Sequence, residues 1–541
     1  MVNQRKNNHT GSFLKGTLVL TVAGMVVKVI GSLNWIILSR VLGGEGIGLY
    51  QMAFPIYLLA LSLSSAGIPV AISIITAEKV ALQDYRGANR VFTVSLALLS
   101  LSGLVLSLFV YFGAGWLIEK GIIRDARAYP AILALAPAIF LVTLLSSFRG
   151  YLQGWQRMTP TAVSQIVEQV FRVGAMLLFA ALLLPKGIEY AAGGASLGAG
   201  FGAAAGLLVL IYYYLRLQHS LPVDTFNRNR NTLESSTSLI RRIVYLALPV
   251  SLSSLMLPLV SNLDLFIVPF RLEEAGYTVE QATEHFGYLT GMAVPLVNLA
   301  TLITAALATA LVPAMATAVS SDNKQLVKQK IGSAIRLANL VTIPAAVGLA
   351  VVATPLATAV YHAPEAGSVV QVVAAGVYML GIHQVTTGIL QGMGRTALPL
   401  VNMGIAALVK VALNWNLVAI PSLGILGAGW ATNADFGVAA ILNLFFVYRY
   451  SRFSVHMGSL IKIITATAVM GITLYAANDS LIQHMSALLV ICADISIAIV
   501  VYGVTLLLVR ELTEQDIMRI PLAGKGLARL LLLCGLIKKS S

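Results

Sequence analysis

The chain has 541 residues, of which 58% are hydrophobic and only 11% are charged. A soluble protein of this length carries roughly a quarter charged residues, so the composition excludes the soluble globular classes. A net charge of +14 would suit a nucleic-acid partner, but in a membrane protein it first indicates which loops face the cytoplasm. We therefore expect an all-α polytopic membrane protein that binds membrane lipids and no nucleic acid.

Apolar stretches of about 20 residues, enough to cross ~30 Å of hydrocarbon as a helix, recur along the whole chain. The first begins near Leu14 and is too long for a signal-peptide core, so we expect it to be retained. About fourteen spans are predicted, at 14–42, 49–77, 91–117, 129–154, 158–184, 190–217, 243–269, 286–319, 333–361, 367–393, 397–420, 424–448, 459–477 and 485–509.

The positive charges sort to one side of these spans. Of the 36 lysines and arginines, 26 fall in the N-terminal arm, the even-to-odd loops and the C-terminal tail, and six fall on the other side. The remaining four lie inside spans. Because short loops rich in Lys and Arg stay in the cytoplasm, both termini are predicted to be cytoplasmic.

Short motifs recur in the two halves of the chain. "GYLQG" at 150–154 returns as "GILQG" at 388–392, "MAFP" at 52–55 as "MAVP" at 292–295, and "PKGIEYAAGGA" from Pro185 resembles "PSLGILGAGWA" from Pro421. Two six-helix lobes of the same orientation are a known transporter plan, with the substrate site between them. The expected organisation is a first lobe at 1–217, a cytoplasmic linker at 218–242, a second lobe at 243–450, two added helices at 451–510 and a cytoplasmic amphipathic tail at 511–541.

Charges inside the spans mark the candidate site, because each costs about 2.5–3.5 kcal/mol at mid-membrane. The first half carries a surplus of cations, which suits an anionic substrate such as a phosphate. Glu168 and Arg172 are spaced to pair on one helix face, a pairing that would also serve simply to lock the fifth helix. Arg149 lies near a span end, where its side chain can instead reach the inner surface. The predicted substrate cavity comprises Lys28, Asn34, Arg149, Gln153, Gln165, Glu168, Arg172 and Lys410.

Acidic and amide side chains in the second half suit a coupling cation. The predicted cation site comprises Asp264, Asn414, Thr432 and Asp435. Oxygen ligands of this kind fit Na⁺, and a lone buried aspartate equally carries a proton, so both ions stay open. No other cofactor and no metal site are expected, since the histidines are scattered singly. The sequence carries no signal for a particular oligomeric state.

Several segments resemble the stage V sporulation protein B family of the multidrug/oligosaccharidyl-lipid/polysaccharide (MOP) exporter superfamily, a relative of MurJ-like lipid II flippases and Wzx-type polysaccharide flippases. They are residues 12–59, "GIPVAIS" at 67–73, "RGYLQGWQRMTPTAVSQIVEQVFR" at 149–172 and 185–195. Asn34 and Trp35 stand where the flippases usually have an Arg-Asp pair, and Asp264, Asn414 and Thr432 loosely match their proposed cation site. The resemblance implies two lobes, two added helices, and transport of an undecaprenyl-pyrophosphate-linked peptidoglycan precursor for the spore cortex, in the cytoplasmic membrane of a spore-forming bacterium.

Two other functions stay open. A multidrug or cation antiporter shares this fold, although a cationic first-half cavity is a poor host for cations. A membrane glycosyltransferase would need acidic catalytic residues on a substantial outer loop, and the outer loops here are short; the richest is 271–287. We therefore expect a transporter and no enzyme.

Overall fold

The computed structural model describes residues 2–65, 67–220, 234–321, 323–453 and 457–512. Within these ranges every regular element is a helix and none is a strand, which confirms the all-α class. Contacts group the chain into two compact units, unit 1 at residues 1–287 and unit 2 at residues 288–541.

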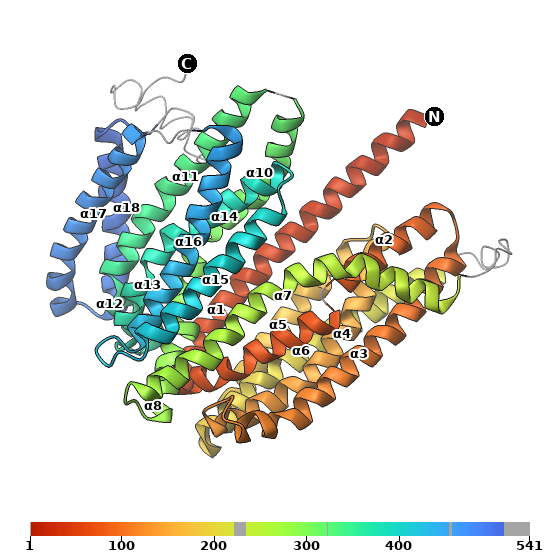
Figure 1. Cartoon of the computed structure of the whole chain (residues 1–541), viewed down its shortest axis with the longest axis horizontal. Coiled ribbons are helices and arrows are strands. Elements are labelled where there is room, and N and C mark those ends of the chain that lie inside the picture. Colours follow the sequence, from red (N-terminus) through yellow and green to blue (C-terminus); the bar gives the residue numbers. More distant parts are fainter. Residues whose placement is uncertain (1, 66, 221–233, 322, 454–456, 513–541) are drawn as a thin grey trace. The chain divides into compact units, whose positions relative to one another are not determined.

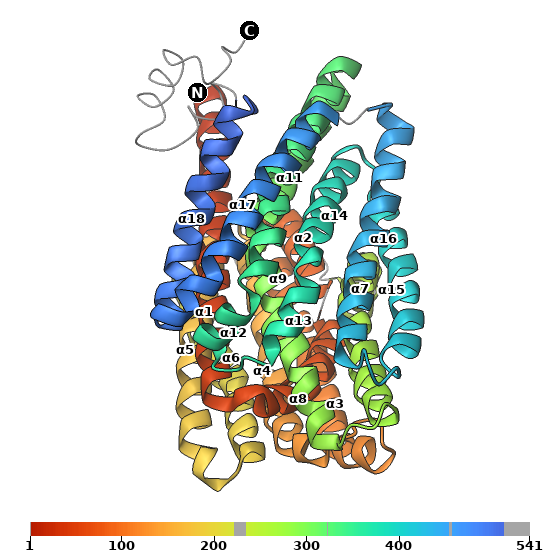
Figure 2. The same ribbon diagram turned by 90° about the vertical axis from the view of Figure 1, so that its left-hand side faces the viewer.

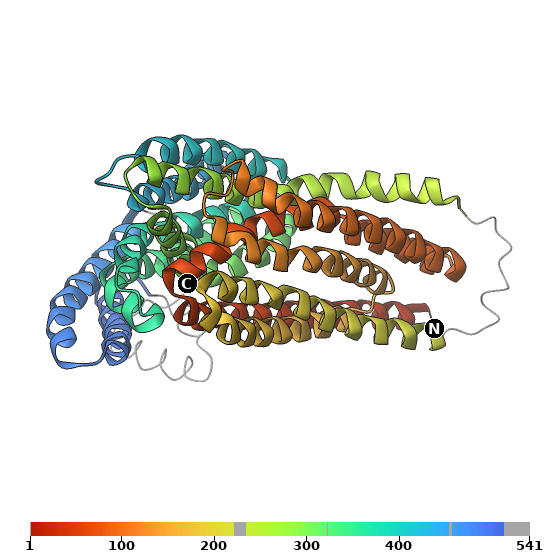
Figure 3. The same cartoon turned by 90° about the horizontal axis from the view of Figure 1, so that it is seen from below.

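Unit 1 is a bundle of long helices, coloured red to yellow-green in Figures 1 and 3. Its elements are α1 (Val2–Ser65), α2 (Ile68–Ala81), α3 (Tyr85–Glu119), the 3₁₀ turn η1 (Ala126–Ala128), α4 (Tyr129–Gly154), α5 (Thr159–Leu183), the 3₁₀ turn η2 (Leu184–Lys186), α6 (Ile188–Ser220), α7 (Ser236–Glu274) and α8 (Val279–Gly287). A positive φ of 64° at Gly43 breaks α1 between the first two expected spans, a conformation that glycine adopts without steric cost.

Unit 2 contains the remaining helices. They are a short π-helix η4 (Tyr288–Ala293), α9 (Val294–Ala300), α10 (Leu302–Ser320), α11 (Lys324–Val351), α12 (Ala353–Tyr361), α13 (Ala366–Val373), α14 (Ala375–Gly392), α15 (Ala397–Leu417), α16 (Ile425–Ser451), α17 (Met457–His484) and α18 (Ala487–Leu508). Figure 2 shows α15 beside α16 and α17 beside α18, and both pairs are in contact.

Most expected spans coincide with one helix or with two consecutive helices, while α1 covers the first span and part of the second, and η4, α9 and α10 together cover 286–319. In the described part of the chain, eleven helices, or twelve if one bent pair is a single span, are long and apolar enough to cross a membrane. The count of fourteen spans and the cytoplasmic position of both termini stay predictions. The division into lobes at 218–242 also stays a prediction, and α7, which follows that linker, packs on α1 and α2 of unit 1. Residues 221–233 of the linker and 513–541 of the tail lie outside the described residues.

Ion pairs connect loops at the two ends of unit 1. At one end, Glu78 pairs with Arg242, and the Lys79 Nζ atom lies 3.6 Å from the Glu234 Oε2 atom. At the other end, Asp125 is only 2% exposed and accepts hydrogen bonds from Arg127, whose guanidinium also contacts Glu45. Loops expected on the same side of the membrane are therefore joined to each other.

Glycines of α6 bring its backbone against α5. They recur every fourth residue at 194, 198, 202 and 206, which puts them on one helix face. A Cβ atom at Gly202 would lie 2.6 Å from the carbonyl oxygen of Glu168 and 2.7 Å from the Cβ of Arg172. Neither distance is compatible with a side chain. The glycines therefore fix the depth at which these two charged residues of α5 sit.

The repeated "GYLQG" and "GILQG" motifs use the same device. A Cβ at Gly150 would meet the carbonyl oxygen of Pro69 on α2 at 2.7 Å. A Cβ at Gly388 on α14 would meet the carbonyl oxygen of Ala308 on α10 at 2.4 Å. Small residues four apart let helix backbones approach closely in membranes. The sequence repeat is thus a repeat of one helix contact, made once within each unit.

Replacing Gly202 by alanine should destabilise the protein. The added methyl group has no space beside Glu168, so we expect a loss of about 1–3 kcal/mol. Gly200 on the same helix has no atom within 4 Å of an added Cβ, so Gly200→Ala should be neutral or gain up to about 1 kcal/mol of helix propensity. Thermal unfolding of the two purified variants in detergent tests this. Equal midpoints would show that the contact does not hold α5.

Candidate functional site

Three charged side chains of unit 1 form a cluster between α4 and α5. The Glu168 carboxylate accepts a hydrogen bond from Arg149 Nη2 at 2.8 Å and one from Arg172 Nη2 at 3.4 Å. Arg149 also donates to Ser164 Oγ at 3.2 Å. One carboxylate is therefore shared by two guanidiniums, and the cluster keeps a formal charge of +1. The i, i+4 pair expected from the sequence is present, and Arg149 joins it rather than reaching for the inner surface.

Partial burial makes this sharing necessary. The side chains of Arg149, Glu168 and Arg172 are 19%, 14% and 22% exposed. In a low-dielectric setting an unpaired ion is costly, and pairing with additional hydrogen bonds offsets that cost. Ser164, which is fully buried, supplies such a bond. The second guanidinium, Arg172, has the longer bond to the carboxylate and is the one held less tightly.

Helix α1 forms the wall beside Arg172. Tyr50 and Tyr57 of α1 are both 2% exposed, and α1 packs against α5. A Cβ at Gly31 would lie 3.3 Å from the amide nitrogen of Gln169, three residues before Arg172. The glycine therefore lets α1 approach α5 close to the cluster.

Two predicted cavity residues of α1 have different surroundings. Lys28, three residues before Gly31, has an exposed side chain. Asn34 is 6% exposed, and its amide nitrogen lies 2.9 Å from the sulfur of Met176 on α5. Asn34 thus packs between the helices, while Lys28 is exposed on α1.

The predicted glutamines lie on the two helices of the cluster. Gln153 is near the end of α4, where its amide nitrogen lies 3.4 Å from Thr161 Oγ1 of α5. Gln165 is partly buried on α5, one turn before Glu168. Both therefore lie in the region of the Arg149–Glu168–Arg172 cluster.

Residues predicted for a coupling cation fall in both units. Asp264 is on α7 of unit 1, while Asn414 on α15 and Thr432 and Asp435 on α16 belong to unit 2. Asn414 is 1% exposed and Thr432 is 3% exposed, with its hydroxyl donating to the Ala428 carbonyl at 2.9 Å. Because α15 and α16 pack as a hairpin, the unit 2 residues lie on adjoining helices.

Lys410, the predicted cation of the second half, lies one turn before Asn414 on α15. Lys410 is only 7% exposed, so it is among the most deeply buried charged residues of the described chain. The described residues hold no group of three or more His, Cys, Asp or Glu side chains placed to bind a metal ion. Any ion bound in unit 2 would thus have amide and hydroxyl ligands beside a carboxylate.

Sequence reasoning missed a buried polar network in unit 2. The Asn443 carbonyl accepts from Asn402 at 2.8 Å, and its amide donates to Thr387 Oγ1 at 3.0 Å and lies 3.3 Å from His383 Nδ1. Asn402 and Asn443 are 1% and 0% exposed. The available signal was an asparagine inside each of two apolar spans, since buried amides need partners.

Family and sequence comparisons agree on the kind of protein. A family model described as polysaccharide biosynthesis protein matches residues 13–319, and one described as MatE matches residues 290–416. Stage V sporulation protein B of Bacillus subtilis (strain 168) is 30% identical over 96% of this chain and 99% of its own length. Lipid II flippase MurJ of the same organism is 26% identical over 86% of this chain and 88% of its own length.

Solved structures share the fold. Lipid II flippase MurJ in an inward closed conformation superposes with a TM-score of 0.66 at 15% identity, over 90% of this chain and 98% of that chain. An inward-facing multidrug resistance MATE family transporter of the MOP superfamily gives a TM-score of 0.63 at 16% identity, over 81% of this chain and 98% of that chain. The chain belongs to the polysaccharide biosynthesis protein family: it is a multi-pass membrane protein related to stage V sporulation protein B, and its relatives include a lipid II flippase.

Proposed function

We propose that the protein is a flippase that moves an undecaprenyl-pyrophosphate-linked glycan, a lipid II-like peptidoglycan precursor, across the cytoplasmic membrane by alternating access. Synthesis of the spore cortex is the process that we assign to it. The likeness to stage V sporulation protein B over nearly the whole chain supports this assignment, as does the likeness to lipid II flippase MurJ.

The observation that carries the proposal is the shared carboxylate of Glu168. Two guanidiniums on one carboxylate leave a surplus positive charge inside a transporter unit. A pyrophosphate that leaves the headgroup region loses its hydration and counterions, and guanidiniums replace them with charge-assisted hydrogen bonds. Arg172 is the donor that we assign to the pyrophosphate, because Arg149 can keep Glu168 neutralised alone.

Lys28 is the second cation that we assign to the substrate. Its exposed amine lies on the part of α1 that approaches α5 beside Arg172. A compact ammonium with three donors binds phosphate oxygens as a point charge. The polyprenyl tail would remain in the lipid while the two cations hold the headgroup.

A second candidate is a multidrug or cation antiporter, which the MatE match over residues 290–416 favours. The two functions differ in the charge of the cargo. The surplus cation of the Glu168 cluster attracts an anionic headgroup and repels a cationic drug. Purified protein in liposomes, scored for both lipid II translocation and drug efflux, decides between them. Efflux without lipid translocation would overturn the proposed flippase.

Lys28→Ala should reduce translocation roughly 10- to 100-fold without loss of folded protein. One charge-assisted contact contributes about 1.5–3 kcal/mol, which corresponds to roughly that factor in rate or affinity. Lys120, exposed at the end of α3, provides the control variant Lys120→Ala, which should translocate normally. Lipid II translocation by the reconstituted variants measures the effect. Normal transport by Lys28→Ala would remove Lys28 from the substrate site.

Arg172→Gln and Glu168→Gln should have different defects. In Arg172→Gln the carboxylate keeps Arg149 at 2.8 Å, so we expect a folded protein, destabilised by roughly 1–2 kcal/mol, that transports poorly. Glu168→Gln leaves two cations without a carboxylate, so it should lose about 3–5 kcal/mol. Thermal unfolding and translocation are measured for both, and for Glu168→Gln with Arg172→Gln. Normal transport by the double variant would show that the pair is only structural.

Asp264→Asn tests the coupling cation. Removing the carboxylate should abolish the response of transport to a Na⁺ or H⁺ gradient, whichever the protein uses, while the midpoint of thermal unfolding changes little. Translocation by proteoliposomes is compared with each gradient imposed separately, and with Asp435→Asn as the second variant. An unchanged gradient dependence in both variants would exclude these carboxylates from coupling.

A further inference from the structure

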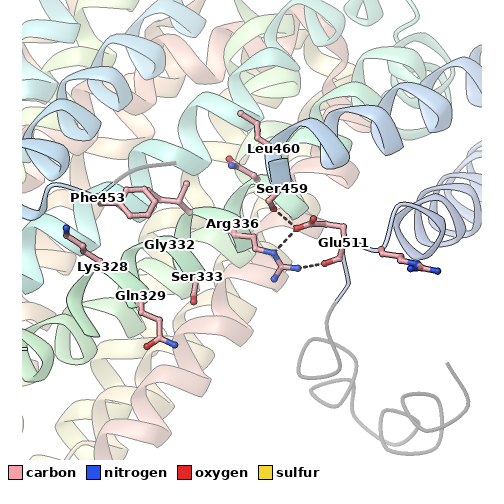
Figure 4. A pocket seen from close by; sticks show the side chains of 12 residues that line it. Lys328, Gln329, Gly332, Ser333, Arg336, Phe453, Ser459, Leu460 and Glu511 are labelled. Atoms are coloured by element: carbon pink, nitrogen blue, oxygen red, sulfur yellow. Dashed lines mark hydrogen bonds and ion pairs between the residues drawn. The ribbon is translucent and has the colours of Figure 1, made fainter. Parts of the chain in front are cut away.

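A pocket of about 390 Å³ opens in unit 2, and none of the residues assigned to transport lines it (Figure 4). One side is the first part of α11, which presents Lys328, Gly332 and Arg336 on one helix face. The other sides are Phe453, two residues after the end of α16, the start of α17, and the residues after α18. Four separate parts of the chain therefore build it.

Two residues with a left-handed backbone conformation shape the pocket. Arg452 and Arg510 have φ angles of 52° and 53° and end α16 and α18. Such a C-terminal residue turns the chain sharply out of the helix. The turns bring Phe453 and Glu511 to α11, and Gly332 leaves space for the Phe453 ring, which would lie 3.2 Å from an added Cβ.

The pocket carries surplus positive charge. Its lining includes three cations (Lys328, Arg336 and Arg510) and one carboxylate (Glu511), which gives a formal charge of +2. Glu511 is 7% exposed and accepts from Arg336 Nε at 2.8 Å, with Ser459 as a further donor. Arg336 also donates to the Glu511 backbone carbonyl at 2.7 Å. Thus Arg336 is already held by Glu511, and Lys328 and Arg510 supply the excess positive charge.

A buried acceptor faces the same pocket. Asn339 lines it one turn beyond Arg336, is 5% exposed, and its Oδ1 has no hydrogen-bond partner among the described residues. A buried carbonyl without a donor costs about 1–3 kcal/mol, and native structures rarely leave one unexplained. A ligand hydroxyl is the donor that would satisfy it. The site therefore fits an anion that also carries a hydroxyl group.

The position of the pocket indicates where this ligand comes from. The start of α11, the segment after α16 and the segment after α18 are all expected at the cytoplasmic face, and the structure brings them together here. Phe453, Leu460 and Ile335 give the pocket apolar walls. Basic pockets between helices at this depth bind anionic lipid headgroups. A phosphate diester with a glycerol headgroup supplies the charge, the hydroxyl and the apolar part together.

We propose that this pocket binds the headgroup of an anionic glycerophospholipid, phosphatidylglycerol in particular, from the inner leaflet. The phosphate lies against Lys328 and Arg336, and a glycerol hydroxyl donates to Asn339 Oδ1. Bound lipid then joins α11 to the ends of α16 and α18. This function is independent of the substrate that unit 1 carries.

The test uses the full-length protein in neutral detergent, with phosphatidylglycerol, phosphatidylcholine or soluble glycerol 1-phosphate added. Since a ligand that binds only the folded state raises the unfolding midpoint, phosphatidylglycerol should raise it in a saturable way. Phosphatidylcholine and glycerol 1-phosphate should not. An equal response to phosphatidylcholine would overturn anionic recognition, and an equal response to glycerol 1-phosphate would show a site for a free phosphate ester instead of a lipid.

Variants locate the binding. Lys328→Gln should weaken phosphatidylglycerol binding about fivefold, as expected for one basic residue at the surface. Lys330→Gln, on the same helix but outside the pocket lining, should not. Asn339→Leu removes the unsatisfied acceptor, so its unfolding midpoint without lipid should be equal or higher, while its response to lipid falls. Equal losses in the two lysine variants, or an unchanged lipid response in Asn339→Leu, would overturn the assignment.

Discussion

A charge inside hydrocarbon must be neutralised where it stands, and this constraint organises unit 1. The Glu168 carboxylate pairs with two guanidiniums at once, that of Arg149 on α4 and that of Arg172 on its own helix. Removing the carboxylate would leave both guanidiniums uncompensated, so Glu168 ties α4 to α5 through Arg149. The same cluster keeps a net positive charge, so the feature that stabilises the unit also makes it receptive to an anion.

The charged cluster depends in turn on residues that have no side chain. Gly202 and Gly206 of α6 allow the backbone of α5 to lie against them at the level of Glu168. In lipid the hydrophobic effect does not drive helices together, so close van der Waals packing must do so. The glycines of "GYLQG" and "GILQG" do this in both units, although the charged residues differ between them. The duplicated feature is thus helix packing, and the charge chemistry is specific to each unit.

Sequence reasoning recovers what periodicity and composition determine. The helical class, the span positions and the Glu168–Arg172 pair all follow from local spacing. It could not assign Arg149, because its partner is 19 residues away and two orientations of a long side chain were equally compatible with the sequence. It also missed Arg336–Glu511, which are 175 residues apart. Contacts of this kind depend on how helices pack, and an isolated charge near a span end does not reveal its partner.

Under the proposed function, the two hydrogen bonds of unequal length determine which arginine leaves Glu168 for the substrate. Arg149 holds Glu168 at 2.8 Å and is anchored by Ser164, whereas Arg172 holds it at 3.4 Å. An arriving pyrophosphate can therefore take Arg172 without leaving the carboxylate bare, since Arg149 remains. On release of the substrate, Arg172 returns to Glu168, which competes with the pyrophosphate for the same guanidinium. Because Glu168 competes only weakly with the pyrophosphate for Arg172, the substrate can bind in one conformation of the transporter and be released in the other. An isolated cation without a competing carboxylate would not release the substrate in this way.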